Sequence, residues 1–355
     1  MVHKIYYKGG GNMLENARYK DKKALVQYDL SIDIFKNYNF NLEDIIPVRK
    51  VFILITDQGN KILKKVDYDA KELEFIYSGL EYIKNNSFNR VFDFILTNEG
   101  KPYLIWNENI YFVMNLIEGR ESEYSNPLDI ITASKGIGEL HKACEGFRHE
   151  NKTRFTCGKT IENFKRKLQE MELFKNIAML TEVKSEFDEI FLENYNYYVN
   201  QIEDSIKVLE KSSFYKLCSQ EDKIVLCHHD LAHHNILIKD EEAYFVDFDY
   251  SVIDLKVHDL CNFMNKVEKR VAYDIEKSKL IIDNYCLNNE LSKNELEVLY
   301  GMLIFPQDIY NILKEYYTRI KEWDYSIFLD KLIKKNDFKE DREEFLELFK
   351  NKIIG

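Results

Sequence analysis

Two short stretches of this sequence decide its fold and its chemistry: CHHDLAHHNILI at residues 227–238 and AYFVDFD at residues 243–249. Each stretch contains a strand-like run of apolar residues, and the polar residues 240–242 between them are typical of a tight turn. The pattern therefore predicts a hairpin within the segment 223–252. A hairpin brings the polar loop before its first strand close to the end of its second strand.

Three polar residues in these stretches have the chemistry that phosphoryl transfer needs. Transfer from ATP requires a carboxylate that accepts the proton of the attacking hydroxyl, and oxygen ligands that hold Mg²⁺ against the phosphates. Asp230, Asn235 five residues later, and Asp247 at the end of the next strand can supply these groups. The short loop and the hairpin are expected to bring all three to one place.

The segments HHDLAHHN at residues 228–235 and VDFD at residues 246–249 resemble the paired motifs of the aminoglycoside phosphotransferase and choline kinase group. That group is the small-molecule branch of the protein-kinase-like superfamily. The resemblance implies that Asp230 is the catalytic base and that Asn235 and Asp247 are Mg²⁺ ligands. It also implies that His228 braces the catalytic loop.

Two aspartates have supporting roles by the same resemblance. Asp249 supports the loop or a second metal ion, and Asp259 anchors the catalytic loop. Two other interpretations of the loop stay open. The four histidines within residues 228–234 would suit a histidine metal site, or they and Asp230 would be ordinary loop and core residues.

The first third of the chain is expected to form the nucleotide-binding lobe, with a β-hairpin of strands over 48–56 and 61–66. The resemblance implies a lysine on the second strand that contacts the phosphates, and Lys64 fits this role. Ile62 shares a face with Lys64 because side chains alternate along a strand, so Ile62 is expected to cover adenine. Lys65 is the alternative to Lys64, and the glutamate partner is left open between residues 72 and 74.

The segment 114–118 is expected to be the hinge, whose backbone hydrogen-bonds adenine. This assigns Met114 and Leu116 to the nucleotide site. One feature departs from the kinase pattern, because residues 45–52 contain no glycine and no Gly-x-Gly-x-x-Gly precedes Lys64. Without that loop the β- and γ-phosphates lose backbone N–H donors.

Further stretches resemble one branch of this superfamily, the CotS-like spore coat proteins of spore-forming bacteria. The resemblance extends from about Pro47 to Asp324 and rests on segments spread along the chain: Thr56-x-x-Gly59 with Leu63-Lys64, Phe88 to Val91, Tyr111 to Glu121, Phe305 to Asp308, Tyr316-Tyr317 and Trp323.

The resemblances imply three hypotheses of function. In the first, the chain uses ATP and Mg²⁺ to phosphorylate an unknown small-molecule or coat-component acceptor. In the second, it is a catalytically inactive kinase-fold structural or assembly factor of the spore coat, which the missing glycine loop favours. In the third, it is a metabolic kinase of the choline or aminoglycoside type.

The expected fold is α+β and bilobal, with a small antiparallel-sheet lobe and a mainly helical lobe. The boundaries that we predict are a flexible tail over residues 1–22, an N-terminal lobe over 23–117 and a C-terminal lobe over 118–355. The hairpin segment 223–252 lies within the helical lobe.

Composition narrows the partners and the location. The 355 residues include 50 Lys and Arg against 61 Asp and Glu, which gives a net charge of −11. With no basic cluster, nucleic acid and anionic membranes are not expected partners. The six cysteines are scattered as in reduced cytosolic proteins, and the first residues do not form a signal peptide. We expect synthesis in the cytoplasm of the mother cell, deposition in the spore coat and contacts with other coat proteins.

Overall fold

The computed structural model describes residues 30–48, 51–180, 182–271 and 273–355. The predicted tail over residues 1–22 lies outside these ranges. Contacts between residues divide the chain into two compact units, one of which runs to Phe155 and also contains His228–Val252. The other unit contains Thr156–Cys227 and Ile253–Gly355. The lobe boundary between residues 117 and 118 stays a prediction.

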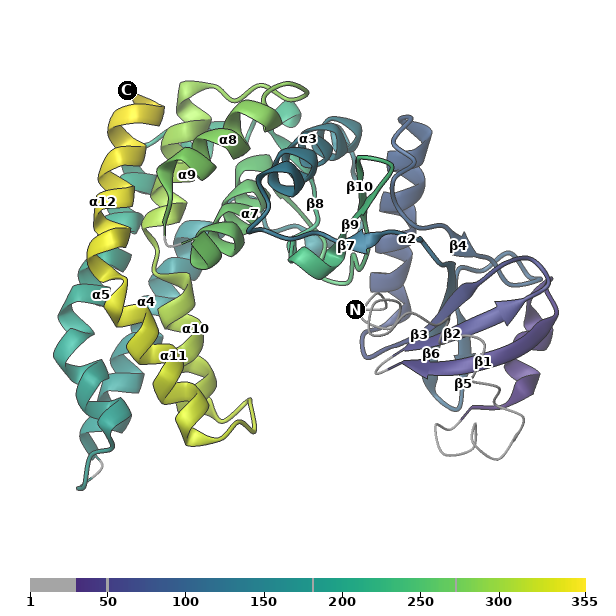
Figure 1. Cartoon of the computed structure of the whole chain (residues 1–355), viewed down its shortest axis with the longest axis horizontal. Coiled ribbons are helices and arrows are strands. Elements are labelled where there is room, and N and C mark those ends of the chain that lie inside the picture. Colours follow the sequence, from purple (N-terminus) through teal and green to yellow (C-terminus); the bar gives the residue numbers. More distant parts are fainter. Residues whose placement is uncertain (1–29, 49–50, 181, 272) are drawn as a thin grey trace. The chain divides into compact units, whose positions relative to one another are not determined.

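The first unit is built on an antiparallel sheet in the order β1-β2-β3-β6-β4, with β5 paired to β6 (Figure 1). A 3₁₀ helix, η3, precedes it. The bounds are η3 Ile32–Asn37, β1 Leu42–Val48, β2 Val51–Thr56, β3 Lys61–Val66, β4 Phe94–Ile95, β5 Leu104–Trp106 and β6 Asn109–Asn115. The core beneath β1, β2, β3 and β6 is continuous and includes the buried side chains of Phe35, Phe52, Leu63 and Val113.

The predicted hairpin of 48–56 and 61–66 is confirmed for its turn and its second strand, and its first strand is shorter than expected. Val48 belongs to β1, a strand that the sequence pattern did not indicate. Glu43, Asp44 and Pro47 interrupt the apolar alternation of β1. Proline is tolerated there because β1 is an edge strand, which needs fewer backbone donors than a central strand.

Strand β3 lies in the middle of the sheet, between β2 and β6. Its register places Ile62 opposite Met114 and Lys64 opposite Phe112. The expected shared face of Ile62 and Lys64 therefore runs beside the end of β6, where the segment 114–118 begins. The pairing of β3 with β6 therefore brings three residues expected in the nucleotide site, Ile62, Lys64 and Met114, next to one another.

Helix α2 (Ala70–Asn85) follows β3 and begins where the Asp69 carboxylate accepts a hydrogen bond from the backbone N–H of Glu72. Its buried face includes Leu73, Ile76 and Leu80, which repeat at helical spacing. Helix α3 (Pro127–Cys144) packs against α2.

A second, three-stranded sheet of this unit carries the predicted catalytic hairpin. It has the order β10-β9-β7, with bounds β7 Arg120–Glu121, β9 Ile236–Lys239 and β10 Glu242–Phe245. Helix α3 lies against β10 so closely that a Cβ on Gly136 would sit 2.8 Å from the Cβ of Ala243. The close approach of helix and strand requires glycine at this position.

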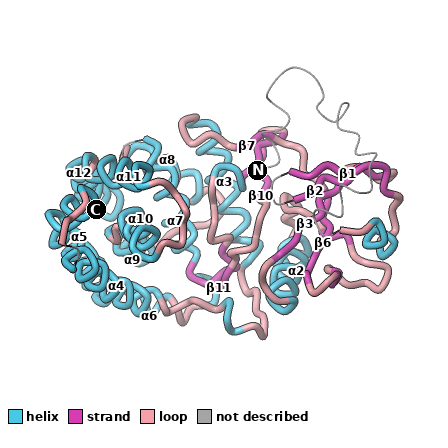
Figure 2. The backbone as a smooth tube through the Cα atoms, turned by 90° about the horizontal axis from the view of Figure 1, so that it is seen from below, coloured by secondary structure: helices cyan, strands magenta, loops and turns pink. Residues whose placement is uncertain are grey.

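The second unit is almost entirely helical, and its long helices are drawn in cyan in Figure 2. Its strands β8 and β11 pair with each other. The remaining elements of the chain are η4 Lys152–Arg154, α4 Thr160–Leu180, α5 Glu186–Lys211, α6 Phe214–Leu217, η5 Glu221–Lys223, β8 Ile224–Cys227, η6 His233–Asn235, β11 Val252–Leu255, α7 Lys256–Val271, α8 Ile275–Tyr285, α9 Lys293–Ile304, α10 Gln307–Thr318, α11 Tyr325–Asp337, α12 Lys339–Phe349 and the π-helical turn η7 Lys350–Ile354. Among the described residues, no helix has the length and apolar character that crossing a membrane requires.

Candidate active site

The loop between β8 and β9 brings Asp230 and Asn235 into direct contact. The Asn235 side-chain amide donates hydrogen bonds to the Asp230 carboxylate and to the Asp230 backbone carbonyl, each at 2.9 Å. The short 3₁₀ turn η6 (His233–Asn235) closes the loop and makes this contact possible. Because the amide nitrogen of Asn235 is turned toward Asp230, its carbonyl oxygen is the group that can serve as a metal ligand.

His228 ties this loop to the segment that carries the second motif. The backbone N–H of Asp230 donates to His228 Nδ1 at 3.3 Å. The proton of the neutral ring then lies on Nε2, which is 2.9 Å from the carbonyl oxygen of Val246 and donates to it. The ring is fully buried, against Phe248. One histidine thus links the backbone of the candidate base to the residue before Asp247.

Asp247 and Asp249 lie on either side of a single ammonium group. Lys64 Nζ is 2.7 Å from Asp247 Oδ1 and 2.7 Å from Asp249 Oδ2. The lysine comes from β3, and both aspartates follow β10, where Asp247 is 183 residues after Lys64 in the chain. Asp247 has a positive φ of 67°, a conformation that is strained for a side chain other than glycine and that is common at functional sites.

The charges of Lys64 and the two aspartates shift the pKa values of Lys64 and Asp247. Burial lowers the pKa of Lys64, but Asp247 and Asp249 outweigh this effect and hold its pKa above the ordinary value. Burial raises the pKa of Asp247, and the Lys64 charge and hydrogen bond outweigh it, so the pKa of Asp247 is lowered. At neutral pH the lysine is therefore a cation held by an ionised carboxylate.

Neither glutamate that the sequence left open pairs with Lys64. Glu72 binds Arg154, with its Oε2 atom 2.6 Å from Arg154 Nη2, and Glu74 accepts a hydrogen bond from the Tyr103 hydroxyl at 3.1 Å. Arg154 was not found from the sequence, because a single arginine in a polar segment carries no motif. Tyr68, which donates to Asp249 Oδ1 at 3.1 Å, was missed for the same reason.

A cavity of about 320 Å³ opens beside these groups within the first unit. Ile62, Lys64, Met114 and Leu116, all expected in the nucleotide site, line it together with the predicted metal ligands and Asp249. The other lining residues are mainly apolar: Val48, Val51, Phe92, Phe112, Asn115, Ile117, His234, Leu237, Val246 and Tyr250. The volume lies in the range of small-molecule sites, and an apolar pocket with a few polar groups at one end is their usual form.

The polar end of this cavity has the donor set of a magnesium site. Asn235 and Asp247 offer one amide oxygen and one carboxylate, and Mg²⁺ bound with nucleotide commonly takes one or two protein oxygens and completes its shell with phosphate and water. Among the described residues, which include the histidine-rich loop, no three His, Cys, Asp or Glu side chains are grouped as a metal site would require.

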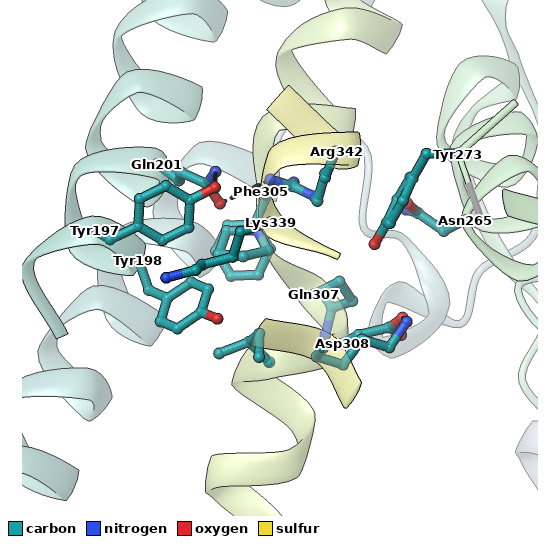
Figure 3. Close-up of a pocket in the computed structure, with 13 residues that line it drawn as sticks. Tyr197, Tyr198, Gln201, Asn265, Tyr273, Phe305, Gln307, Asp308, Lys339 and Arg342 are labelled. Carbon is teal, nitrogen blue, oxygen red and sulfur yellow. Dashed lines mark hydrogen bonds and ion pairs between the residues drawn. The ribbon is translucent and has the colours of Figure 1, made fainter. Parts of the chain in front are cut away.

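Asp259 lies in the second unit, buried in the first turn of α7. Its expected role in anchoring the catalytic loop stays a prediction. The second unit has cavities of its own, and Figure 3 shows one in which Gln201 and Arg342 lie side by side. Its volume is about 30 Å³, enough for about two water molecules, and Arg342 donates to the carbonyls of Leu303 and Ile304. This cavity is part of the helix packing.

Comparison with solved structures defines the class to which this fold belongs. An aminoglycoside phosphotransferase from Alicyclobacillus acidocaldarius subsp. acidocaldarius aligns with a TM-score of 0.81 at 16% identity, over 91% of this chain and 96% of its own. The AMP-bound complex of a spectinomycin phosphotransferase aligns with a TM-score of 0.66 at 15% identity, over 91% and 98% of the two chains. The chain has the kinase-like fold that the sequence predicts, with an antiparallel-sheet N-terminal region and a helical C-terminal region.

The sequence profile of the family described as "Spore coat putative kinase YutH" matches residues 31–349, and the chain belongs to this family. The endospore coat-associated protein YutH of Bacillus subtilis (strain 168) is 23% identical over 251 residues, which are 70% of this chain and 71% of that protein. The expected membership in a spore coat family with a kinase-like fold is confirmed, and the family that matches is the one named for YutH. The assignment to the CotS-like branch stays a prediction.

Proposed function

We propose that this chain is an ATP- and Mg²⁺-dependent phosphotransferase that acts on a hydroxyl or amine of a small molecule or of a spore coat component. One observation carries the proposal. Asn235, Asp247 and Lys64, from three separate segments, line one largely apolar cavity, and Asn235 donates a hydrogen bond to the carboxylate of Asp230. A purely structural role gives no reason for an apolar pocket to end in these groups.

In this proposal the Asp230 carboxylate accepts the proton of the acceptor hydroxyl as its oxygen attacks the γ-phosphorus of ATP. The new O–P bond forms while the bond between the γ-phosphorus and the β,γ-bridging oxygen breaks, and ADP leaves with that electron pair. Asn235 orients the Asp230 carboxylate through its amide N–H. The adenine ring of ATP packs against the apolar wall formed by Ile62, Met114 and Leu116.

Lys64 has to change partners in this scheme. Its ammonium lies between the two carboxylates, and a triphosphate at the polar end of the cavity would offer it oxygens of higher charge. Bound Mg²⁺ would supply neutralisation of the phosphate charge beside Asn235 and Asp247. The AMP-bound spectinomycin phosphotransferase of the same fold supports a nucleotide in this cavity.

The test is a calorimetric titration of the full chain with a non-hydrolysable ATP analogue, with Mg²⁺ and with a chelator. We expect binding that Mg²⁺ strengthens in the unaltered protein and a loss of this strengthening in Asp247→Asn. Asp240→Asn is the matched control, because Asp240 is exposed at the turn of the same hairpin and asparagine tolerates its positive φ. Absence of nucleotide uptake by the unaltered chain would reject the proposal.

A structural or assembly role in the spore coat without catalysis is the second candidate. The absence of glycine in residues 45–52 and the coat association of the Bacillus subtilis relative favour it. Both candidates include deposition in the coat, with other coat proteins as partners. An Asp230→Ala strain separates them, because a normal coat in that strain supports the structural role and a defective coat with normal protein levels supports catalysis.

A further inference from the structure

The guanidinium of Arg154 joins three segments of the first unit. Arg154 is the last residue of the short turn η4, and its side chain is buried, with 11% of its surface exposed. Nη1 donates to the carbonyl oxygens of Asp249 at 2.6 Å and of Ser251 at 3.1 Å, and Nη2 lies 2.6 Å from Glu72 Oε2 on α2. Arg154 therefore makes direct polar contacts with both α2 and the turn after Asp247.

The turn that Arg154 holds carries both aspartates of the second motif. Residues 246–251 form no strand ladder, so their carbonyls need partners from elsewhere in the fold. Arg154 supplies two of these partners at once, since a guanidinium has several donors in one rigid plane. The backbone at Asp247 is strained, at φ 67°, and such a conformation persists only where the surrounding contacts fix it.

Asp249 is held at both ends by this arrangement. Its carbonyl oxygen accepts from Arg154, and its carboxylate accepts from Tyr68 and binds Lys64. The ring of Tyr68 in turn lies under the guanidinium, 5.6 Å from Arg154 Cζ to the ring centroid. The position of the carboxylates therefore depends on the arginine and on α2 through direct contacts.

We propose that Arg154 is a positioning residue of the nucleotide and metal site. In this role Glu72 of α2 pairs with Arg154 and not with Lys64. This inference rests on the proposed function, because the site that Arg154 positions is the one proposed to bind Mg²⁺ and ATP. Arg154 touches neither ligand. It fixes the turn that presents Asp247, and it couples the first turn of α2 to that turn.

The experiment measures how much Mg²⁺ strengthens the binding of a non-hydrolysable ATP analogue, as the ratio of the dissociation constants in chelator and in Mg²⁺. In Arg154→Met we expect this ratio to fall by about 10- to 100-fold, as is typical when a residue that orients a metal ligand is lost. The dissociation constant in chelator is expected to change less than threefold, because the apolar wall of the cavity is intact.

Three further variants make the result specific. Arg154→Lys keeps the charge but has one nitrogen in place of the two through which the guanidinium reaches the carbonyls and the Glu72 carboxylate, so it is expected to lose most of the same ratio. It also covers the case in which Arg154→Met does not fold. Glu72→Gln keeps both carbonyl contacts and is expected to lose less. Arg166→Met is the control, because Arg166 is exposed on α4 and binds Glu170 on the same helix.

Hydrogen exchange gives a readout that does not depend on ligand. Arg154→Met is expected to raise exchange in residues 246–251 and in the first turn of α2 together, whereas Arg166→Met leaves both unchanged. If the arginine variants fold and keep the wild-type ratio, or if they weaken binding equally with and without Mg²⁺, the inference is overturned. If the unaltered chain takes up no nucleotide, both the proposed function and this inference are rejected. That outcome is distinct from one in which the unaltered chain binds nucleotide and only the role of Arg154 is rejected.

Discussion

Replacing Lys64 by methionine tests the electrostatic centre of the candidate site. The substitution keeps the length of the side chain and removes the ammonium that lies 2.7 Å from both Asp247 and Asp249. The two carboxylates then face each other without the cation. We expect the unit that contains them to lose stability at neutral pH.

The size of the loss follows from the exposure of each partner. Only 14% of the Lys64 side chain is exposed, and Asp249 is 24% exposed, so their bond is a largely buried ionic hydrogen bond of about 1.5–2 kcal/mol. Asp247 is 40% exposed, so solvent reduces its contribution to about 0.5 kcal/mol. Repulsion between the two uncompensated carboxylates adds about 0.5 kcal/mol more to the loss of stability. The free energy of unfolding is therefore expected to fall by about 2.5–3 kcal/mol.

Tryptophan fluorescence can follow each unit separately during urea unfolding. The chain has two tryptophans, and Trp106 lies on β5 of the first unit whereas Trp323 lies in the second unit. In a Trp323→Phe background the signal reports the unit that contains Lys64. Lys65→Met is the matched control, because Lys65 is the next residue on β3 and is exposed.

The effect of Lys64→Met should also depend on pH in a definite direction. The pKa of Asp247 is lowered in the folded protein, so its ion pair contributes stability at neutral pH and loses it as pH falls below the ordinary value of 3.8 through the folded pKa. Without the lysine, protonation of one carboxylate relieves the repulsion. The destabilisation is thus expected to be smaller at about pH 5 than at about pH 7.5. Equal losses in Lys64→Met and Lys65→Met, or a loss that grows toward acid pH, would refute the reasoning.

Three shorter predictions address the loop and its support. Asp230→Asn should lower phosphoryl transfer by about 10²- to 10⁴-fold and leave analogue binding by calorimetry within about threefold, and equal losses of both would remove Asp230 from the role of base. His228→Phe should raise hydrogen exchange in the segment 228–235, because the ring no longer links Asp230 to Val246. Gly136→Ala should lower the urea midpoint by the equivalent of about 1–3 kcal/mol, because its Cβ would meet Ala243 at 2.8 Å, and an unchanged midpoint would show that α3 shifts freely.

Much of the fold could be predicted because its elements differ in the period of their apolar residues. The apolar residues of helices α2 and α3 recur at helical spacing, and the strands β9 and β10 form the hairpin that was predicted within the segment 223–252. Strand β1 was missed because it is an edge strand whose charged residues and proline hide the alternation. The side chains of β1 are buried by the neighbouring strand and the core of the sheet, and the order of apolar residues in β1 does not indicate this burial.

The sequence by itself determined which chemistry is present. Asp230, Asn235 and Asp247 stand at spacings that a short loop and one hairpin bring together, so local structure is enough to predict their meeting. The family resemblance added Lys64, Ile62, Met114 and Leu116, and the cavity is lined by all four.

Only the tertiary structure decided how the charges of the site are paired. Lys64 meets Asp247 across 183 residues and Arg154 meets the Asp249 carbonyl across 95, and no local rule fixes contacts at such separations. Burial then makes each buried charge depend on the partner that packing supplies, because an unpaired ion in the interior is costly. The sequence determines which ionisable residues this site contains, and tertiary packing determines which of them pair with one another.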